Sequence, residues 1–223
     1  MDFQILDMEH GLFSFESLDA SIRSCELHEC SPLVRINGLD AIATQKAMDL
    51  GAHGIIFPQV KSLSEVENAV KLTHYAPRGV RGFNPFTRVS DYSLVRPSEN
   101  RNSNGFALTG VIVETLQAVD ELDKILQVPD LDIVYIGSYD LSVALGAPGD
   151  MKNPKLMSIV ESSIVKIRNA NSIAGVMVQD PSEVSKYHKL GANFIVVGVD
   201  SFLIGKSFLN IKEQYTRALG GTL

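Results

Sequence analysis

Acidic, basic and imidazole side chains occur in this sequence where apolar runs end. The first apolar run leads into Asp7, Glu9 and His10, and the second contains Arg35 among aliphatic residues. A guanidinium is always charged, so within an apolar run it needs an anion, and it can stabilise an oxyanion or an enolate. His10 could move protons near neutral pH. These residue types indicate enolate chemistry next to a carbonyl group.

Two carboxylates at the ends of later apolar runs, Glu114 and Asp140, suit a hard divalent cation. They would leave about four positions of an octahedral ion for water and substrate, as in Mg²⁺ or Mn²⁺ sites. A thiolate metal site is not expected, because the chain has only 2 cysteines. The sequence therefore predicts that Glu114 and Asp140 bind a divalent metal.

Each of these groups also has a structural explanation. A lone histidine after a strand is often a satisfied structural residue, and Thr115, Asp140 or Asp200 could cap the helix that follows it. Ion-pair networks also occupy clefts, so a single carboxylate there is weak support for a site. The coincidence of several such groups favours the functional interpretation.

Short apolar runs alternate with stretches of helical period, which predicts parallel strands joined by crossover helices in one α/β domain, residues 1–223. If the parallel strands close into an α/β barrel, its chemistry lies at the carboxyl ends of the strands. Seven strands are expected, at Phe3–Glu9, Pro32–Asn37, Gly54–Val60, Leu108–Glu114, Asp132–Gly137, Ala174–Val178 and Phe194–Asp200.

The predicted helices have recognisable ends. Capping boxes are expected to begin at Ser62 and Asp180, Pro154 suits a first helical position, and Gly51 and Gly191 suit helix ends. One connection, residues 76–106, is unusually long for a compact domain. Such loops tend to be lids, binding loops or interfaces, and a passive insertion is equally open.

Composition excludes several classes of partner. The 223 residues include 20 Lys and Arg against 26 Asp and Glu, a net charge of -6 without a long basic run, so no nucleic acid partner is expected. No apolar run is long enough to span a membrane. Cys25 and Cys30 are predicted to lie in one helix at a spacing that keeps their side chains apart, and no signal peptide is recognised. A cytoplasmic protein is expected.

Seven short motifs follow one another along the chain. They are Asp7-Met8-Glu9-His10-Gly11, Leu33-Val34-Arg35, Ala47-Met48-Asp49-Leu50-Gly51-Ala52, Pro77-Arg78-Gly79-Val80-Arg81-Gly82, Val113-Glu114-Thr115, Gly137-Ser138-Tyr139-Asp140-Leu141-Ser142 and Val197-Gly198-Val199-Asp200. In this order they resemble the HpcH/HpaI aldolase family of metal-dependent class II pyruvate aldolases, which includes 4-hydroxy-2-oxoheptanedioate and 2-keto-3-deoxy sugar-acid aldolases.

The resemblance implies a TIM (β/α)8-type barrel that reversibly cleaves a 4-hydroxy-2-oxo acid to pyruvate and an aldehyde. It implies that Glu114 and Asp140 hold the metal, with Mg or Mn expected first and Co or Zn as alternatives. Arg35 is similar to the residue that stabilises the pyruvate enolate. His10 is similar to the family's acid/base, and Asp49 to the carboxylate that orients it.

The resemblance also implies substrate-binding groups and an assembly. Backbone amides at Gly137, Ser138 and Tyr139 would receive the substrate carboxylate. Members of the family form hexamers with exchanged C-terminal helices, so a homo-oligomer is expected, with the helix at about 201–218 packed on a neighbouring subunit.

The sequence departs from the family pattern in ways that leave other functions open. Ile112 stands where the family usually has Gln, Ser138-Tyr139 replaces the commoner Pro-Ala, and Phe83 replaces a smaller residue. A related carbon–carbon bond-forming synthase, or a catalytically silent barrel that binds a partner, is therefore an alternative.

The first βα unit of the family is missing from the predicted elements. A truncated start, a true seven-stranded barrel, or a gap closed by another polypeptide would each account for this.

Overall fold

The computed structural model describes residues 1–94 and 107–220. Within them, seven strands form one sheet in which neighbours along the chain are neighbours in space, and all pairs are parallel. The strands are β1 (Phe3–Asp7), β2 (Ser31–Arg35), β3 (Gly54–Phe57), β4 (Leu108–Val113), β5 (Ile133–Ile136), β6 (Ile173–Val178) and β7 (Phe194–Val197). All seven predicted strands are confirmed, although most end one to three residues before their predicted ends.

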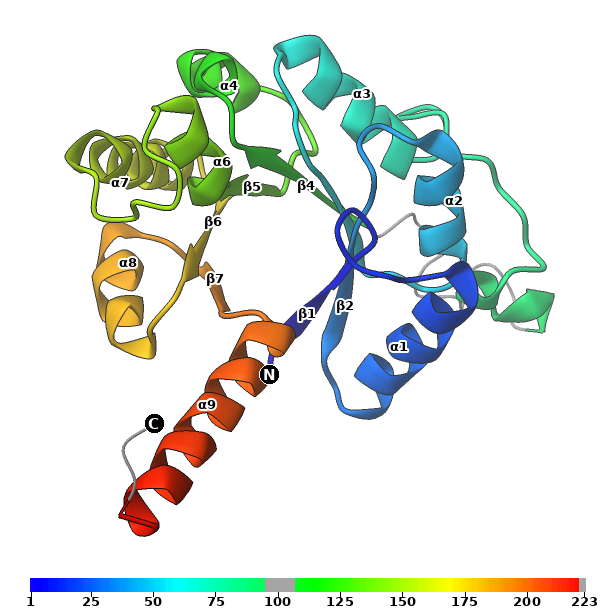
Figure 1. Cartoon of the computed structure of the whole chain (residues 1–223). Coiled ribbons are helices and arrows are strands. Elements are labelled where there is room, and N and C mark those ends of the chain that lie inside the picture. Colours follow the sequence, from blue (N-terminus) through cyan, green and yellow to red (C-terminus); the bar gives the residue numbers. More distant parts are fainter. Residues whose placement is uncertain (95–106, 221–223) are drawn as a thin grey trace.

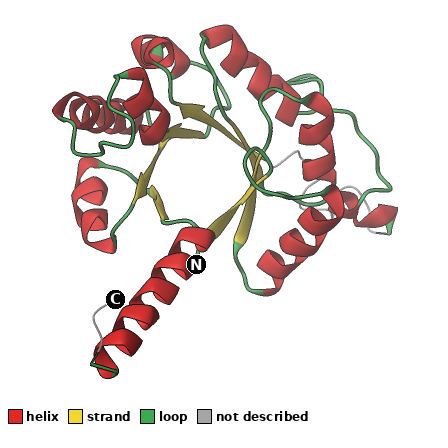
Figure 2. Cartoon of the chain, viewed as in Figure 1, coloured by secondary structure: helices red, strands yellow, loops and turns green. Residues whose placement is uncertain are grey.

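The sheet curls, and the helices cover its outer side (Figures 1 and 2). Alternate side chains of each strand point to opposite faces of the sheet, so the curl has two cores. The outer core joins strands to helices, for example through Val34 and Leu18. The inner core consists of strand residues, with Leu33, Ile56 and Ile112 among its buried members. This arrangement confirms the predicted α/β barrel-type fold, with seven strands.

The helices and helical turns of the described residues follow the strands in regular order. They are α1 (Phe15–Leu27), α2 (Ala41–Asp49), α3 (Leu63–Thr73), η1 (Arg88–Ser93), α4 (Leu116–Asp120), α5 (Leu122–Ile125), α6 (Ser138–Ala144), α7 (Pro154–Asn169), η2 (Pro181–Glu183), α8 (Val184–Leu190) and α9 (Asp200–Ala218).

The predicted helix ends are largely confirmed. The Ser62 hydroxyl accepts a hydrogen bond from the third residue of the following turn, Pro154 is the first residue of α7, and Asp180 forms a complete capping box. Gly51 and Gly191 have φ values of 102° and 115°, which favour glycine because other residues rarely adopt them.

The expectations for the two cysteines and for the long connection have different outcomes. The placement of both cysteines in one helix is wrong: α1 ends at Leu27, and the chain turns through Glu29, whose φ is 54°, to reach Cys30 just before β2. Of the long connection, residues 76–94 are described and include η1, whereas residues 95–106 lie outside the described part of the chain.

The two edge strands of the sheet, β1 and β7, meet through aromatic side chains. The Phe3 and Phe194 rings stack with centroids 4.1 Å apart and an angle of 15° between their planes. Phe194 also meets the edge of the Tyr135 ring, with centroids 6.2 Å apart. Stacked rings on the inner face therefore link the first and last strands.

The last helix, α9, lies apart from both cores. It has no buried residue and projects from the body of the barrel (Figure 1). Its apolar side chains Ile204, Phe208, Ile211 and Tyr215 are all exposed, and their spacing places them on one helical face. Among residues 1–94 and 107–220, no helix combines the length and apolar character needed to cross a membrane.

Because Phe194 joins the two edges, the substitution Phe194→Ala should be costly. The side chain is 6% exposed, and removal of a buried Phe typically lowers the free energy of unfolding by about 3–5 kcal/mol. Phe86→Ala is the matched control, because Phe86 is 71% exposed and its loss should change that free energy by less than about 0.5 kcal/mol. Urea unfolding of both variants tests this, and equal midpoints would show that the stack does not join the edges.

Candidate active site at the carboxyl end of the barrel

Most of the predicted site residues come together at the carboxyl ends of the strands, and Asp49, at the end of α2, does not join them. Asp7 and Arg35 are the last residues of β1 and β2, and Glu114 directly follows β4. Leu33 and Ile112 lie in the inner core, so the period of two in a strand directs Arg35 and Glu114 toward the same interior. The fold therefore assembles a cation and several carboxylates at one end of the barrel.

Arg35 is held by two carboxylates from the first strand and the turn after it. Its Nε donates to Asp7 Oδ1 at 2.8 Å, its Nη2 contacts Asp7 Oδ2, and its Nη1 lies 3.2 Å from Glu9 Oε2. Burial opposes the charge of Arg35, but Asp7, Glu9 and Glu114 outweigh it and raise the pKa of the guanidinium. Burial likewise opposes the charge of Asp7, but Arg35 and backbone N–H groups lower the pKa of that carboxyl.

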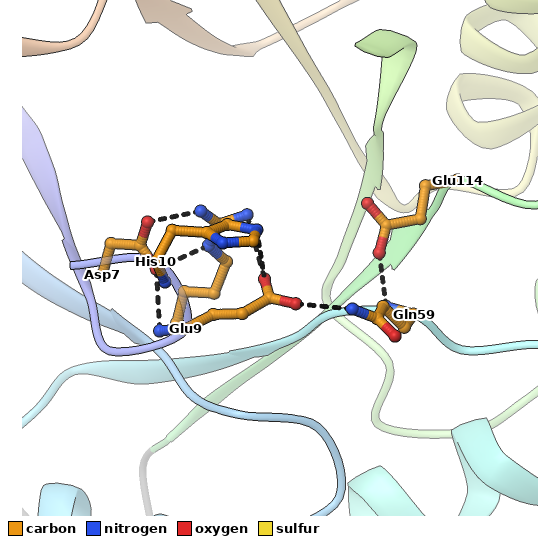
Figure 3. Close-up of polar contacts among 6 residues, drawn as sticks. Asp7, Glu9, His10, Gln59 and Glu114 are labelled. Carbon is orange, nitrogen blue, oxygen red and sulfur yellow. Dashed lines mark hydrogen bonds and ion pairs between the residues drawn. The ribbon is translucent and has the colours of Figure 1, made fainter. Parts of the chain in front are cut away.

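The turn after β1 is shaped by the same carboxylate. Asp7 Oδ1 accepts hydrogen bonds from the backbone N–H groups of Glu9 at 3.0 Å and His10 at 3.2 Å (Figure 3). These bonds direct Glu9 toward the barrel mouth and leave His10 at the rim. Asp7 therefore orients Arg35 and forms the turn that carries Glu9.

Gln59, after β3, connects the two sides of the site and was missed by the sequence reasoning. Its backbone N–H donates to Glu114 Oε1 at 2.5 Å, and its side-chain Nε2 donates to Glu9 Oε1 at 2.8 Å (Figure 3). Its φ is 57°, in the left-handed region. The available signal was an amide two positions after the apolar run at residues 54–57.

Glu114 is buried, with 6% of the residue exposed. Burial is the largest cause that raises the pKa of its carboxyl from 4.5 to about 7; the Gln59 N–H and Arg35 oppose this, while Asp140 and Glu9 add to it. At neutral pH the carboxylate is thus readily protonated unless a cation accompanies it. Asp140 is exposed in the first turn of α6 and acts on Glu114 through its charge.

Gly137 gives Glu114 the space that it occupies. A Cβ atom at residue 137 would lie 2.5 Å from Glu114 Cβ and 2.8 Å from Glu114 Oε2. Real side chains do not approach so closely, so any larger residue at 137 would displace the carboxylate. The glycine therefore has a role in the site besides the predicted contact of its backbone with substrate.

Residues around the start of α6 form another part of the rim. Ser138 begins the helix, and the exposed Tyr139 accepts a hydrogen bond at its hydroxyl from Nε2 of Gln179, which follows β6. Thr115 caps α4 by accepting from the Ala118 N–H, which confirms the structural explanation for that residue. No side chain caps α6, so Asp140 has no capping role.

His10 and Asp49 lie in different environments. The His10 side chain is 71% exposed, and its Nε2 lies 3.8 Å from Glu9 Oε2. Asp49, at the end of α2, accepts from Nη2 of the buried Arg81 at 2.9 Å, and Arg81 in turn lies 4.6 Å from the centroid of the Tyr75 ring. Within one chain, the described partner of Asp49 is Arg81, and the pairing of Asp49 with His10 stays a prediction.

The donor set fits a divalent cation that water and substrate also coordinate. Among the described residues, no three Asp, Glu, His or Cys side chains are grouped to hold a metal by themselves. Glu114 and Asp140 supply two carboxylates, and Asp7 and Glu9 already neutralise Arg35. The buried negative charge of Glu114 beside the exposed Asp140 is costly without a cation. Burial raises the pKa of the Glu114 carboxyl to about 7, so a cation beside it would favour its charged form.

Comparison with known proteins places this geometry in a family. The model of the HpcH/HpaI aldolase/citrate lyase family matches residues 1–207. The chain is 30% identical over 206 residues to a 4-hydroxy-2-oxo-heptane-1,7-dioate aldolase of Salmonella heidelberg (strain SL476), covering 92% of this chain and 78% of the relative.

Solved structures similar to this chain agree with the match to this family. An HpcH/HpaI aldolase/citrate lyase family protein from Burkholderia cenocepacia J2315 has a TM-score of 0.88 at 25% identity, covering 96% of this chain and 86% of that one. The citrate synthase SbnG has a TM-score of 0.87 at 26% identity, covering 99% and 86%. The citrate lyase beta subunit of M. tuberculosis, solved with oxaloacetate and magnesium, shares the fold at 15% identity, a TM-score of 0.53 and coverage of 88% and 81%.

These similarities indicate an enzyme of the aldolase and lyase type that acts on small molecules. The carboxylates and guanidinium at the carboxyl end of the barrel are consistent with that class. With residues 1–207 matched by its model, the chain belongs to the HpcH/HpaI aldolase/citrate lyase family.

Proposed function

We propose that this protein is a metal-dependent class II pyruvate aldolase that reversibly cleaves a 4-hydroxy-2-oxo acid to pyruvate and an aldehyde. The observation that carries the proposal is the buried Glu114, whose pKa is raised to about 7, beside Asp140 and within the electrostatic reach of Arg35. The similarity to a 4-hydroxy-2-oxo-heptane-1,7-dioate aldolase supports the choice of substrate class.

Glu114 and Asp140 would hold the divalent metal, with Mg or Mn favoured by the oxygen donors and Co or Zn as alternatives. When bound, such an ion acts as a Lewis acid that polarises the keto and carboxylate oxygens of a 2-oxo acid. The backbone at Gly137, Ser138 and Tyr139 would receive the substrate carboxylate.

Arg35 would stabilise the enolate oxygen. A guanidinium has five N–H groups, and the contacts with Asp7 and Glu9 involve Nε, Nη1 and Nη2. Two N–H groups remain for an incoming oxygen, and the carboxylates fix the plane in which these groups point. Arg35 is therefore oriented before substrate binds, as transition-state stabilisation requires.

His10 would move the proton. In cleavage, the substrate's 4-hydroxyl loses its proton and C4 becomes the aldehyde carbonyl as the C3–C4 bond breaks. The electron pair of that bond forms the enolate, and protonation of the enolate at C3 gives pyruvate. His10 lies at the rim with most of its side chain exposed, which suits proton exchange through water. Asp49 remains the proposed carboxylate that orients His10, although Arg81 is its partner within one chain.

A carbon–carbon bond-forming synthase is the second candidate, because the citrate synthase SbnG matches 99% of this chain at 26% identity. Such an enzyme would use the same enolate and a different acceptor. Tyr139 and Ile112, which depart from the usual family residues, lie on or below the rim where an acceptor would approach. The two candidates are distinguished by measuring activity with pyruvate and a panel of aldehydes and comparing it with activity toward oxaloacetate.

Arg35→Lys should lower kcat for pyruvate release at least about tenfold, because an ammonium does not reproduce the bidentate contacts of a guanidinium. Glu114→Ala or Asp140→Ala should abolish metal-dependent release. Glu67→Gln on the exposed face of α3 is the control and should keep wild-type activity. A coupled assay of pyruvate measures all four variants, and unchanged turnover in the Glu114 or Asp140 variant would refute the metal assignment.

Glu114 should also make the metal-free protein less stable as pH rises. Because its folded pKa of about 7 exceeds its ordinary value of 4.5, the folded state binds the proton more tightly, so stability falls between these values by up to about 3 kcal/mol. The contribution of Asp7, whose pKa is lowered from 3.8, is constant above about pH 5.

In EDTA, denaturant unfolding from pH 4.5 to 8 should show this loss, and Glu114→Gln should remove it. Saturating Mn²⁺ should offset the loss in the wild type alone, because the ion stabilises the ionised carboxylate. Equal pH dependence in the wild type and Glu114→Gln would contradict the assigned environment of Glu114.

We also propose that the protein is a cytoplasmic homo-oligomer, a hexamer by resemblance, in which α9 packs on a neighbouring subunit. The support is the exposed apolar face of α9, since large exposed apolar patches mark interfaces. Cys25 and Cys30 are free thiols, which fits a reducing compartment.

Phe208→Glu should lower the molar mass in solution, because it places a charge on the apolar face of α9. Asn210→Glu adds the same charge to another face of the helix and should leave the mass unchanged. Light scattering after size exclusion measures both. An unchanged mass for Phe208→Glu would exclude this face as the interface.

A further inference from the structure

Gln59 contacts both halves of the candidate site from a third strand. Its backbone N–H reaches Glu114, 55 positions along the chain, and its side-chain amide reaches Glu9, 50 positions away. Glu9 also contacts Arg35 at 3.2 Å. One residue thus connects the proposed metal ligand with the carboxylate that helps to hold the proposed enolate-binding guanidinium.

The backbone at Gln59 is held in a conformation that a non-glycine residue rarely adopts. Its φ is 57°, and positive φ occurs mainly in glycine, with Asn and Asp the usual exceptions. The flanking Pro58 and Val60 are both buried, which fixes the chain on either side. Strain of this kind persists where surrounding contacts determine it, and such residues cluster at active sites.

The backbone and the side chain of Gln59 each hold a different carboxylate. The N–H fixes one oxygen of Glu114 and leaves the other free for a cation. The amide fixes Oε1 of Glu9, while Oε2 of the same carboxylate faces Arg35. Without the amide, Glu9 would lose the hydrogen bond at Oε1 and keep only the contacts of Oε2 with Arg35 and the exposed His10, so it could follow the guanidinium when substrate draws it inward.

We propose that Gln59 is a positioning residue, which acts through Glu9 to fix the position of the Arg35 guanidinium relative to the Glu114 carboxylate. The inference rests on the proposed function. Gln59 does not touch the reacting atoms; its side chain sets the distance between the Arg35 guanidinium and the Glu114 carboxylate.

Two variants separate this role from support of the loop. Gln59→Met keeps an unbranched side chain of similar length and loses the amide. Gln59→Gly also loses the amide, but it keeps the N–H and adopts positive φ without strain. If Gln59 served only to hold the loop, the glycine variant would bind ligands like the wild type. If the amide positions Glu9, both variants should show the same loss.

The test is calorimetric titration of the full-length protein with Mn²⁺ and then with oxalate, a planar dianion that stands in for the pyruvate enolate. In both variants the Kd for Mn²⁺ should stay within about twofold of the wild type, because the N–H to Glu114 remains, and the Kd for oxalate should rise about tenfold. In the pyruvate assay kcat should fall by a similar factor, with a smaller change in KM. Gln127→Met, which replaces an exposed amide just after α5, is the control and should match the wild type.

Wild-type affinity for oxalate in Gln59→Gly would overturn the positioning role and leave the proposed function standing. Failure of the wild-type protein itself to bind Mn²⁺ would overturn the metal-dependent function, and this inference with it. The two failures are therefore distinguishable in one set of titrations.

Discussion

The excess of negative charge at the carboxyl end of the barrel is the constraint on which the candidate site depends. Arg35 is the cation that the described contacts place among Asp7, Glu9 and Glu114, and its contacts go to the first two. Glu114 is left buried with Asp140 as a like-charged neighbour. A buried carboxylate in that position either takes up a proton or binds a cation, and a divalent ion meets the second condition.

The barrel produces this balance by ordinary strand geometry. The inward positions of β2 and β4 run from Leu33 to Arg35 and from Ile112 to Glu114, so the apolar floor and the polar mouth belong to the same rows of side chains. Aliphatic side chains below exclude water, which strengthens electrostatic interactions above them. Gly137 completes the arrangement from β5, since only a residue without a Cβ leaves room for Glu114.

The sequence allowed the strands, most helix ends and the group around Arg35 and Glu114 to be predicted, because these follow from local patterns. Apolar runs of the right length and inward alternation need no knowledge of distant contacts. Gln59 could not be predicted in this way, because its role depends on a turn with positive φ that brings two distant residues within reach. The partner of Asp49 is also a matter of tertiary structure: Arg81 comes from the connection after α3, and the motif that contains each residue does not show that they pair.

The two candidate reactions make different demands on the two sides of the barrel mouth. Under the proposed function, the enolate would form beside Arg35, Glu9, Gln59 and Glu114, which come from the ends of β1 to β4 and are tied to one another by hydrogen bonds and ion pairs. The choice of the carbonyl compound that the enolate attacks, or that leaves from it, would then depend on the remaining rim. There Tyr139 and Gln179 bond to each other and have few other described contacts. An enzyme with more contacts on its enolate side than on the opposite rim could change its acceptor by substitution at the rim alone. Relatives named as aldolases and as a citrate synthase are similar to this one chain, and under the proposed function we expect Tyr139 rather than Arg35 to distinguish the candidate reactions.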